Sequence, residues 1–432
     1  MAQRTFVPAP PFPAVYGLSA AMALGLGVFG GFVIGLYALG GLAFAWPVAR
    51  YAALVQAHGQ VQTLGLAGLL ILGVGALLLP GFWRAKLQRP QVISYGGGLA
   101  GLGLGLQLVG QPLDPGPARQ ILLALAAVLP LAGFLWAGSE LARLRIGQRR
   151  RPAAWEMLLL VAGASLIGAL LVRALYLAEL LRTGLPASYG ALHKALVVLE
   201  LHGFVLGATI AVQLRLLPSL ARTRPVTGWI EYVGMMTLTT AVLVHVAAAG
   251  AGLLALTPAG EWLEAVAVLA LFCATGLWRS GVAPTVQAPA TLLPGRTRQV
   301  LRGTWGALLV AVVGKAAGLL SGDAATHALT SAYLVPLILV VGIRMLPRVS
   351  AYPIRFPRFC GGLVWCGLAG GVLRAFGGTI GVPVGWQLAW LGGCLVTLAV
   401  LIFAALAWSP WGVPTGVPRV PEVTRASTRE SA

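Results

Sequence analysis

Charged residues are scarce in this sequence. They make up 9% of its 432 residues, whereas hydrophobic residues make up 58%. Soluble domains carry roughly 25% charged residues, because their surfaces must be hydrated. The scarcity of charge therefore excludes an ordinary soluble protein. It also excludes a nucleic-acid-binding domain, since no soluble segment is long enough to present a basic face.

Acidic residues, cysteines and histidines are also few. Eleven acidic residues stand against 30 basic ones, so the net charge is +19. The four cysteines lie singly in apolar segments without CxxC spacing, at Cys273, Cys360, Cys366 and Cys394. This pattern indicates small buried side chains and not a disulfide framework or a zinc site. The glycine-rich runs also lack the GK[ST] sequence of a phosphate-binding loop.

Long apolar runs fill the rest of the chain. Runs of about 20 residues are long enough to cross a bilayer as helices. We expect twelve such spans, at 17–46, 52–80, 93–112, 120–144, 153–182, 191–218, 227–256, 260–279, 300–320, 325–347, 359–380 and 385–408. The sequence therefore predicts an all-α polytopic membrane protein. A single transmembrane domain is expected over 17–410, after a proline-rich lead-in at 1–16 and before a flexible tail at 411–432.

The distribution of Lys and Arg tests this count, because cytoplasmic loops accumulate basic residues. With the N-terminus inside, the inner segments hold 23 of the basic residues and the outer segments hold four. A missed or extra helix would destroy this alternation. We therefore predict that both termini are cytoplasmic, with basic loops facing the lipid headgroups of the inner leaflet.

Three of the five histidines recur at similar intervals. His58, His202 and His327 are 144 and 125 residues apart, and each lies near the start of an apolar helix that ends in Leu-Pro. Self-similarity of this kind indicates repeated structural units. We expect three four-helix arcs with pseudo-threefold symmetry, each presenting one imidazole from its second helix.

All five histidines fall in the outer halves of their expected helices, where three embedded cations accompany them. The histidines include His193 and His245, and the cations are Arg173, Lys315 and Arg374. Ionisable groups inside a bilayer indicate a functional site. Imidazoles beside cations suit heme, because its iron takes axial histidines and its propionates pair with Arg or Lys. The alternative is structural: a histidine can reach the headgroups, as is favoured for His193, and Arg173 or Arg374 can pair with Glu179 or with helix-end carbonyls.

The chain resembles two related groups of proteins. Twelve helices with histidines on the second, sixth, seventh and tenth resemble subunit I of the heme–copper oxidases. The repeated His-(Gly/Ala)…Gly…Leu-Pro segments are similar to those of the NnrS family, which is implicated in protection from nitric oxide and is reported to bind heme and copper. The resemblance implies that His58 and His327 are axial ligands of a heme b. It also implies that His202 and His245 bind a second metal, copper.

The sequence departs from the oxidase pattern in its histidine inventory. The tenth helix has only His327 where oxidases have two histidines, and the seventh has a single His245. A complete oxygen-reducing centre is therefore not expected, and no catalysed reaction is assigned. The resemblance implies a heme-binding protein of the nitric oxide response in the bacterial cytoplasmic membrane. The alternatives are a secondary transporter that uses the outer polar residues and a cofactor-free scaffold.

Overall fold

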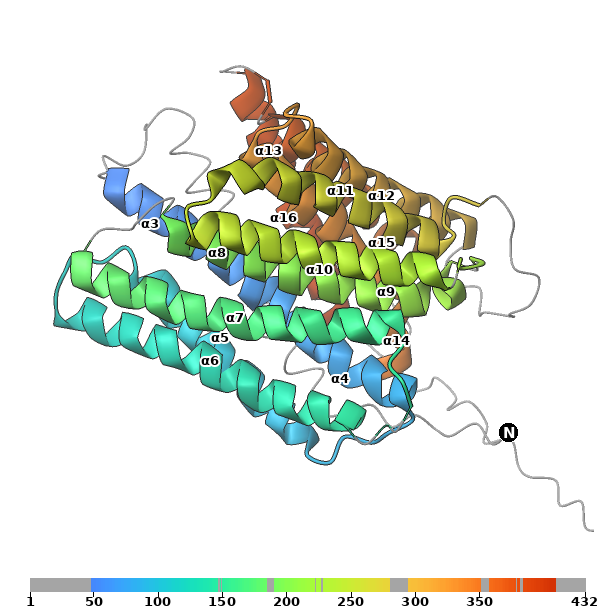
Figure 1. The fold of residues 1–432 in the computed structure, drawn as a ribbon, viewed down its shortest axis with the longest axis horizontal. Coiled ribbons are helices and arrows are strands. Elements are labelled where there is room, and N and C mark those ends of the chain that lie inside the picture. Colours follow the sequence, from blue (N-terminus) through green and yellow to red (C-terminus); the bar gives the residue numbers. More distant parts are fainter. Residues whose placement is uncertain are drawn as a thin grey trace, which may run out of the picture.

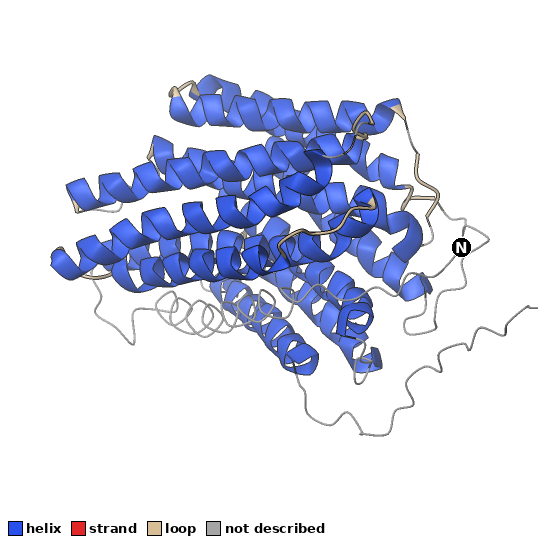
Figure 2. Cartoon of the chain, turned by 90° about the horizontal axis from the view of Figure 1, so that it is seen from below, coloured by secondary structure: helices blue, strands red, loops and turns tan. Residues whose placement is uncertain are grey.

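The structure is a computed structural model that describes most of the chain from residue 48 onward. The described residues are 48–146, 148, 150–184, 190–221, 223–226, 228–279, 294–350, 357–377, 379–380 and 384–408. The lead-in at 1–16, the first expected span at 17–46 and the tail at 411–432 lie outside them. In the described part, the chain forms helices joined by short turns (Figures 1 and 2).

The helices follow the sequence in three groups. The first group is α3 (Val48–Gln60), η2 (Val61–Gly68), α4 (Leu69–Trp83), α5 (Pro90–Gly110) and α6 (Pro117–Ile146). The second is α7 (Ala154–Thr183), α8 (Ala191–Val197), η3 (Val198–Leu206), α9 (Gly207–Leu220), α10 (Trp229–Gly250), η4 (Leu254–Leu256) and α11 (Thr257–Thr275). The third is α12 (Pro294–Ala316), α13 (Gly322–His327), η5 (Ala328–Leu334), α14 (Val335–Ser350), α15 (Pro357–Gly377) and α16 (Val384–Trp408).

The predicted polytopic membrane fold is confirmed for the described residues. Ten helical stretches there are long and apolar enough to cross a membrane. Together with α12, they coincide with the second to twelfth expected spans, with ends that differ by a few residues. Local signals explain several ends: Pro90 occupies the first turn of α5, and Gly184 and Gly276 end α7 and α11 in the left-handed conformation that glycine adopts without strain.

The three groups repeat one arrangement. In each, a composite helix that carries a histidine is followed by two helices that pack against each other along their length: α5 with α6, α10 with α11, and α15 with α16. Glycines allow this close approach in the first and third groups. A Cβ atom on Gly96 would lie 2.5 Å from the carbonyl oxygen of Gly133, and one on Gly392 would lie 2.5 Å from that of Gly370. Small residues at such crossings are typical of membrane helices.

Each composite helix contains a π-helical segment close to its histidine. Segment η2 begins three residues after His58, η3 contains His202, and η5 begins directly after His327. π-helical turns are rare and occur frequently at functional sites. Their recurrence at corresponding places in all three groups is a structural repeat that the spacing of the histidines had indicated.

The three composite helices occupy the interior of the bundle. In the stretches Val55–Trp83, Ala191–Pro218 and Gly322–Ile343, 72%, 67% and 61% of the most apolar window is buried, against 50% or less in the other candidate spans. Their side chains meet in one apolar core, which includes Leu64, Phe204 and Tyr333. The histidine-bearing helices are therefore held by protein on most sides, while the other helices expose large apolar side chains that suit contact with lipid.

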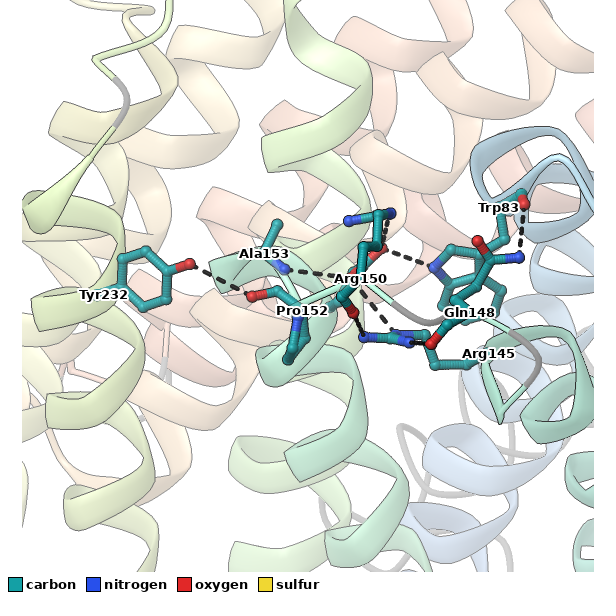
Figure 3. A network of polar contacts seen from close by, with 8 residues as sticks. Trp83, Arg145, Gln148, Arg150, Pro152, Ala153 and Tyr232 are labelled. Carbon is teal, nitrogen blue, oxygen red and sulfur yellow. Dashed lines mark hydrogen bonds and ion pairs between the residues drawn. The ribbon is translucent and has the colours of Figure 1, made fainter.

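The basic loops meet at one end of the bundle. Figure 3 shows part of this end, where Gln148 donates to the carbonyl of Trp83 at 3.0 Å and Tyr232 donates to that of Pro152 at 3.4 Å. The buried Glu156 accepts a hydrogen bond from the Trp83 indole at 2.8 Å and pairs with Arg150. These contacts join the ends of helices from different groups. In Figure 1 this end, with the C-terminal ends of α4, α9 and α14, lies on the right.

The common position of the basic loops predicts the topology that reporter fusions will show. Fusions after Arg89, Arg151 and Arg224 should report the cytoplasm, because lysine- and arginine-rich loops stay inside. Fusions near Asp114 and Gly322 should report the opposite side. One inverted signal within this series would contradict the predicted topology.

The close crossing of α5 and α6 predicts a sharp difference between two glycines of α6. A Cβ atom at Gly133 would collide with the backbone of Gly96 and Ala100, whereas one at Gly138 meets nothing within 4 Å. Gly133→Ala should lower the free energy of unfolding by about 1–3 kcal/mol, the usual cost of overpacking. Gly138→Ala is the matched control and should be neutral or stabilising. Thermal unfolding of the purified protein in detergent measures both, and equal melting temperatures would contradict the crossing.

Candidate functional site

His58 and His327 come from two different groups of helices. His58 lies at the end of α3, within electrostatic range of His327 and Arg374. His327 ends α13, where its Nε2 is 2.7 Å from Nη2 of Arg374 on α15. The Oδ1 of Asp323 lies 3.3 Å from the same nitrogen. This first cluster thus combines two imidazoles, one cation and one anion near the end of the bundle opposite the basic loops.

The hydrogen bonds of the first cluster centre on one imidazole nitrogen. The guanidinium of Arg374 has only donors, so Nε2 of His327 accepts its hydrogen bond. The lone pair of this nitrogen therefore points at the guanidinium, and a metal could bind there only if Arg374 moved aside. Nδ1 of His58 is buried and has no hydrogen-bond partner. Asp323 approaches Arg374 to 3.9 Å and offsets its charge.

His202 and His245 form a second cluster around Glu264 of α11. Nδ1 of His202 is 2.5 Å from one carboxylate oxygen of Glu264, and Nε2 of His245 is 3.6 Å from the other. The two imidazole rings lie 6.1 Å apart. Glu264 is almost completely buried, so the two histidines supply the polar partners that a buried carboxylate requires.

A small cavity borders the second cluster. It is lined by His202, Glu261, Glu264, Lys315, Thr326 and several apolar side chains. Lys315 at the end of α12 reaches to within 3.6 Å of Glu261. The space is only large enough for about one water molecule. Lys315 therefore lies with the second pair of histidines and not with His58 and His327.

Arg173 belongs to a third cluster, formed mainly by glutamines. It is fully buried, and it donates to the carbonyl of Ala126 at 2.6 Å, to Oε1 of Gln60 at 3.2 Å and to Oε1 of Gln107. Its donors are thus engaged within the protein. His193, the histidine for which a structural role was favoured, lies beside Tyr176 with its ring 5.9 Å away.

Several polar residues in these clusters have no counterpart among the predicted site residues. Asp323 lies in the first turn of α13, where an acidic residue has an ordinary role at the positive end of the helix dipole, and Glu264 lies in the interior of α11. A weak signal was present for the glutamines. Gln56 and Gln60 on α3, and Gln107 and Gln111 on α5, are four residues apart, which places each pair on one helix face.

Both clusters contain donor types that a metal cofactor requires. Two imidazoles and an arginine, as in the first cluster, are the residue types that hold a bis-histidine heme. In the second cluster, His202 directs Nδ1 to Glu264, an orientation common in metal-binding histidines, whose other ring nitrogen faces the metal. Among the described residues, no three His, Cys, Asp or Glu side chains are arranged to hold an ion.

Neither a family model nor a curated protein sequence matches the chain. Solved structures do match its fold. One is the cryo-EM structure of a heme-copper terminal oxidase dimer, which is 10% identical, covers 92% of this chain and 83% of its own, and superimposes with a TM-score of 0.63. The chain shares the fold of a heme–copper terminal oxidase. At this identity the likeness establishes the architecture alone, including the central position of the histidine-bearing helices.

The second cluster predicts an asymmetry between two glutamates of α11. Glu264→Leu removes the shared acceptor of two imidazoles, and breaking a buried pair typically costs about 3–5 kcal/mol. Glu261→Leu removes a more exposed partner of Lys315 and should cost about 0–1 kcal/mol. Thermal unfolding in detergent measures both. A Glu264→Leu protein as stable as Glu261→Leu would show that the carboxylate does not hold the two histidines.

Proposed function

We propose that this protein is a membrane-embedded heme protein and that His58 and His327 are the axial ligands of its iron. The main support is that two histidines on corresponding helices of different groups lie within electrostatic range of each other and of Arg374. Both lie beside π-helical segments, and the fold that holds them is heme–copper oxidase-like.

The remaining residues of the first cluster have defined roles in this proposal. Arg374 holds its guanidinium beside His327, where it would pair with a propionate, because arginine binds carboxylates through two parallel hydrogen bonds. Asp323 balances the charge of Arg374 and limits the rotation of the His327 ring. Arg173 and Lys315, the other two cations expected near the propionates, have partners in other clusters, so the proposal assigns the propionate contact to Arg374.

Bound heme would supply a redox-active iron able to exchange one electron. A diatomic gas such as nitric oxide would bind only if it displaced one of the two histidines, because they would fill both axial positions. The similarity of the histidine segments to those of the NnrS family supports a role in the response to nitric oxide, in the bacterial cytoplasmic membrane. Both imidazoles are only partly buried, and the His327 side chain is 22% exposed. Copper at His202 and His245 remains a prediction from the resemblance.

An absorption spectrum of the purified protein, oxidised and reduced, tests the heme proposal. We expect the Soret and α bands of a low-spin bis-histidine heme. His58→Ala and His327→Ala should each abolish this spectrum, because each removes one axial bond. His193→Ala is the matched control and should leave the spectrum unchanged, since His193 lies in another cluster.

Two results would contradict the proposal in different ways. If the wild-type protein, expressed with sufficient heme, never shows these bands, the protein does not bind heme. If both alanine variants keep the wild-type bands, heme is bound by other residues and the assignment of His58 and His327 is wrong. Addition of nitric oxide to the reduced protein should shift the Soret band if the iron responds to this gas.

A further inference from the structure

A continuous polar network lies between α3, α5, α7 and η3, apart from both histidine pairs. Gln107 donates to Gln60 at 2.7 Å and to Gln111 at 2.8 Å, and Gln111 donates to Gln56 at 3.3 Å. Tyr176 donates to Gln56. Arg173 joins the network through Gln60 and Gln107. These side chains are almost completely buried inside a membrane protein, where polar groups are costly and indicate function.

Several buried polar atoms along this network have no hydrogen-bond partner. Ten buried side-chain nitrogen or oxygen atoms have no hydrogen-bond partner among the described residues, and four of them border this network. They are Nε2 of Gln56, Nε2 of Gln60, Nδ1 of His193 and Oε1 of Glu200. Leaving a buried polar atom unsatisfied costs about 1–3 kcal/mol, so such atoms normally bind internal water. Their concentration along one network indicates several bound waters in a row.

We propose that a chain of bound water molecules follows this network from His193 to Glu200. At the outer end, the rings of His193 and Tyr176 are 5.9 Å apart, and Tyr176 contacts Gln56. A water there would accept from Nε2 of Gln56 and donate to Nδ1 of His193. The chain would thus begin at His193 in α8.

The inner end of the water chain is the carboxylate of Glu200. Its Oε2 accepts a hydrogen bond from Thr63 at 3.0 Å, whereas its Oε1 has no partner. The Thr63 hydroxyl also lies 3.2 Å from the backbone carbonyl oxygen of Gln60, which places it next to this glutamine. A water that accepts from Nε2 of Gln60 and donates to Oε1 of Glu200 would satisfy both groups.

The spacing of Arg173 and Glu200 also favours water at this end. Arg173 acts electrostatically on Glu200, yet no direct hydrogen bond or ion pair joins the two among the described residues. Polar groups held apart in an apolar interior are stabilised by polar molecules between them. The water chain would therefore connect a carboxylate in the centre of the bundle to the outer surface, without passing the first cluster.

A second buried network, around Tyr333, can be compared with the network around Tyr176. Gln213 donates to the hydroxyl of Tyr333 at 2.6 Å and accepts from the indole of Trp305 at 2.9 Å. No atom of Gln213, Tyr333 or Trp305 is among the buried atoms that lack a partner. Tyr333 is 0% exposed and Tyr176 is 1% exposed. The two tyrosines are thus equally buried, but only Tyr176 should have water beside it.

X-ray hydroxyl-radical labelling of the full-length protein in ¹⁸O-water tests the proposal. Radicals form from water at the site where it is bound, so a buried tyrosine is labelled only if water is its neighbour. We expect Tyr176 to take up ¹⁸O several-fold faster than Tyr333 in the wild-type protein. Equal rates at the two tyrosines would overturn the proposal, whether or not the protein binds heme.

Two variants identify the source of the effect. Gln56→Leu removes the donor that would hold the outer waters, so labelling of Tyr176 should fall to the rate of Tyr333. Gln213→Leu is the matched control and should leave labelling of Tyr176 unchanged. Unchanged labelling of Tyr176 in the Gln56→Leu protein would overturn the proposed path. If either variant does not fold, the comparison of Tyr176 with Tyr333 in the wild-type protein decides the proposal by itself.

Discussion

The architecture depends on placing polar side chains inside an apolar bundle. In a membrane interior, an imidazole or carboxylate must find its partner on a neighbouring helix, because the lipid offers none. The structure meets this requirement by burying the three composite helices in the centre. The outer helices then shield them from lipid, and their glycines allow the backbones to approach closely enough to keep the interior packed.

In each histidine pair, a side chain from a helix outside the three composite helices contacts an imidazole and orients it. Glu264 of α11 holds His202 and approaches His245, while Arg374 of α15 contacts His327. Such partners orient the ring and determine which nitrogen keeps its lone pair. The π-helical segments next to the three histidines occur in the same helices, so the backbone and the side-chain partners together define where each imidazole lies.

The three cations that the sequence analysis expected at one site lie in three different clusters. Arg173, Lys315 and Arg374 each lie in the second half of a helix, which their positions in the sequence predict. Their lateral positions differ: Arg374 lies with His327, Lys315 with Glu261, and Arg173 with the glutamines. Sequence spacing contains no information about which neighbouring helix a side chain faces, since that depends on how the helices rotate and cross on packing.

The sequence by itself determined the class of protein, eleven of the helices in the described residues and the threefold recurrence of the histidine-bearing helices. These features follow from the length of apolar runs, the alternation of basic loops and the spacing of His58, His202 and His327, all of which are properties of the chain read in one dimension. Only the tertiary structure decided that Glu264 lies between two histidines and that four glutamines from two helices join Arg173. These partners are distant in sequence, and they meet because helix packing leaves a buried polar group no other way to form its hydrogen bonds.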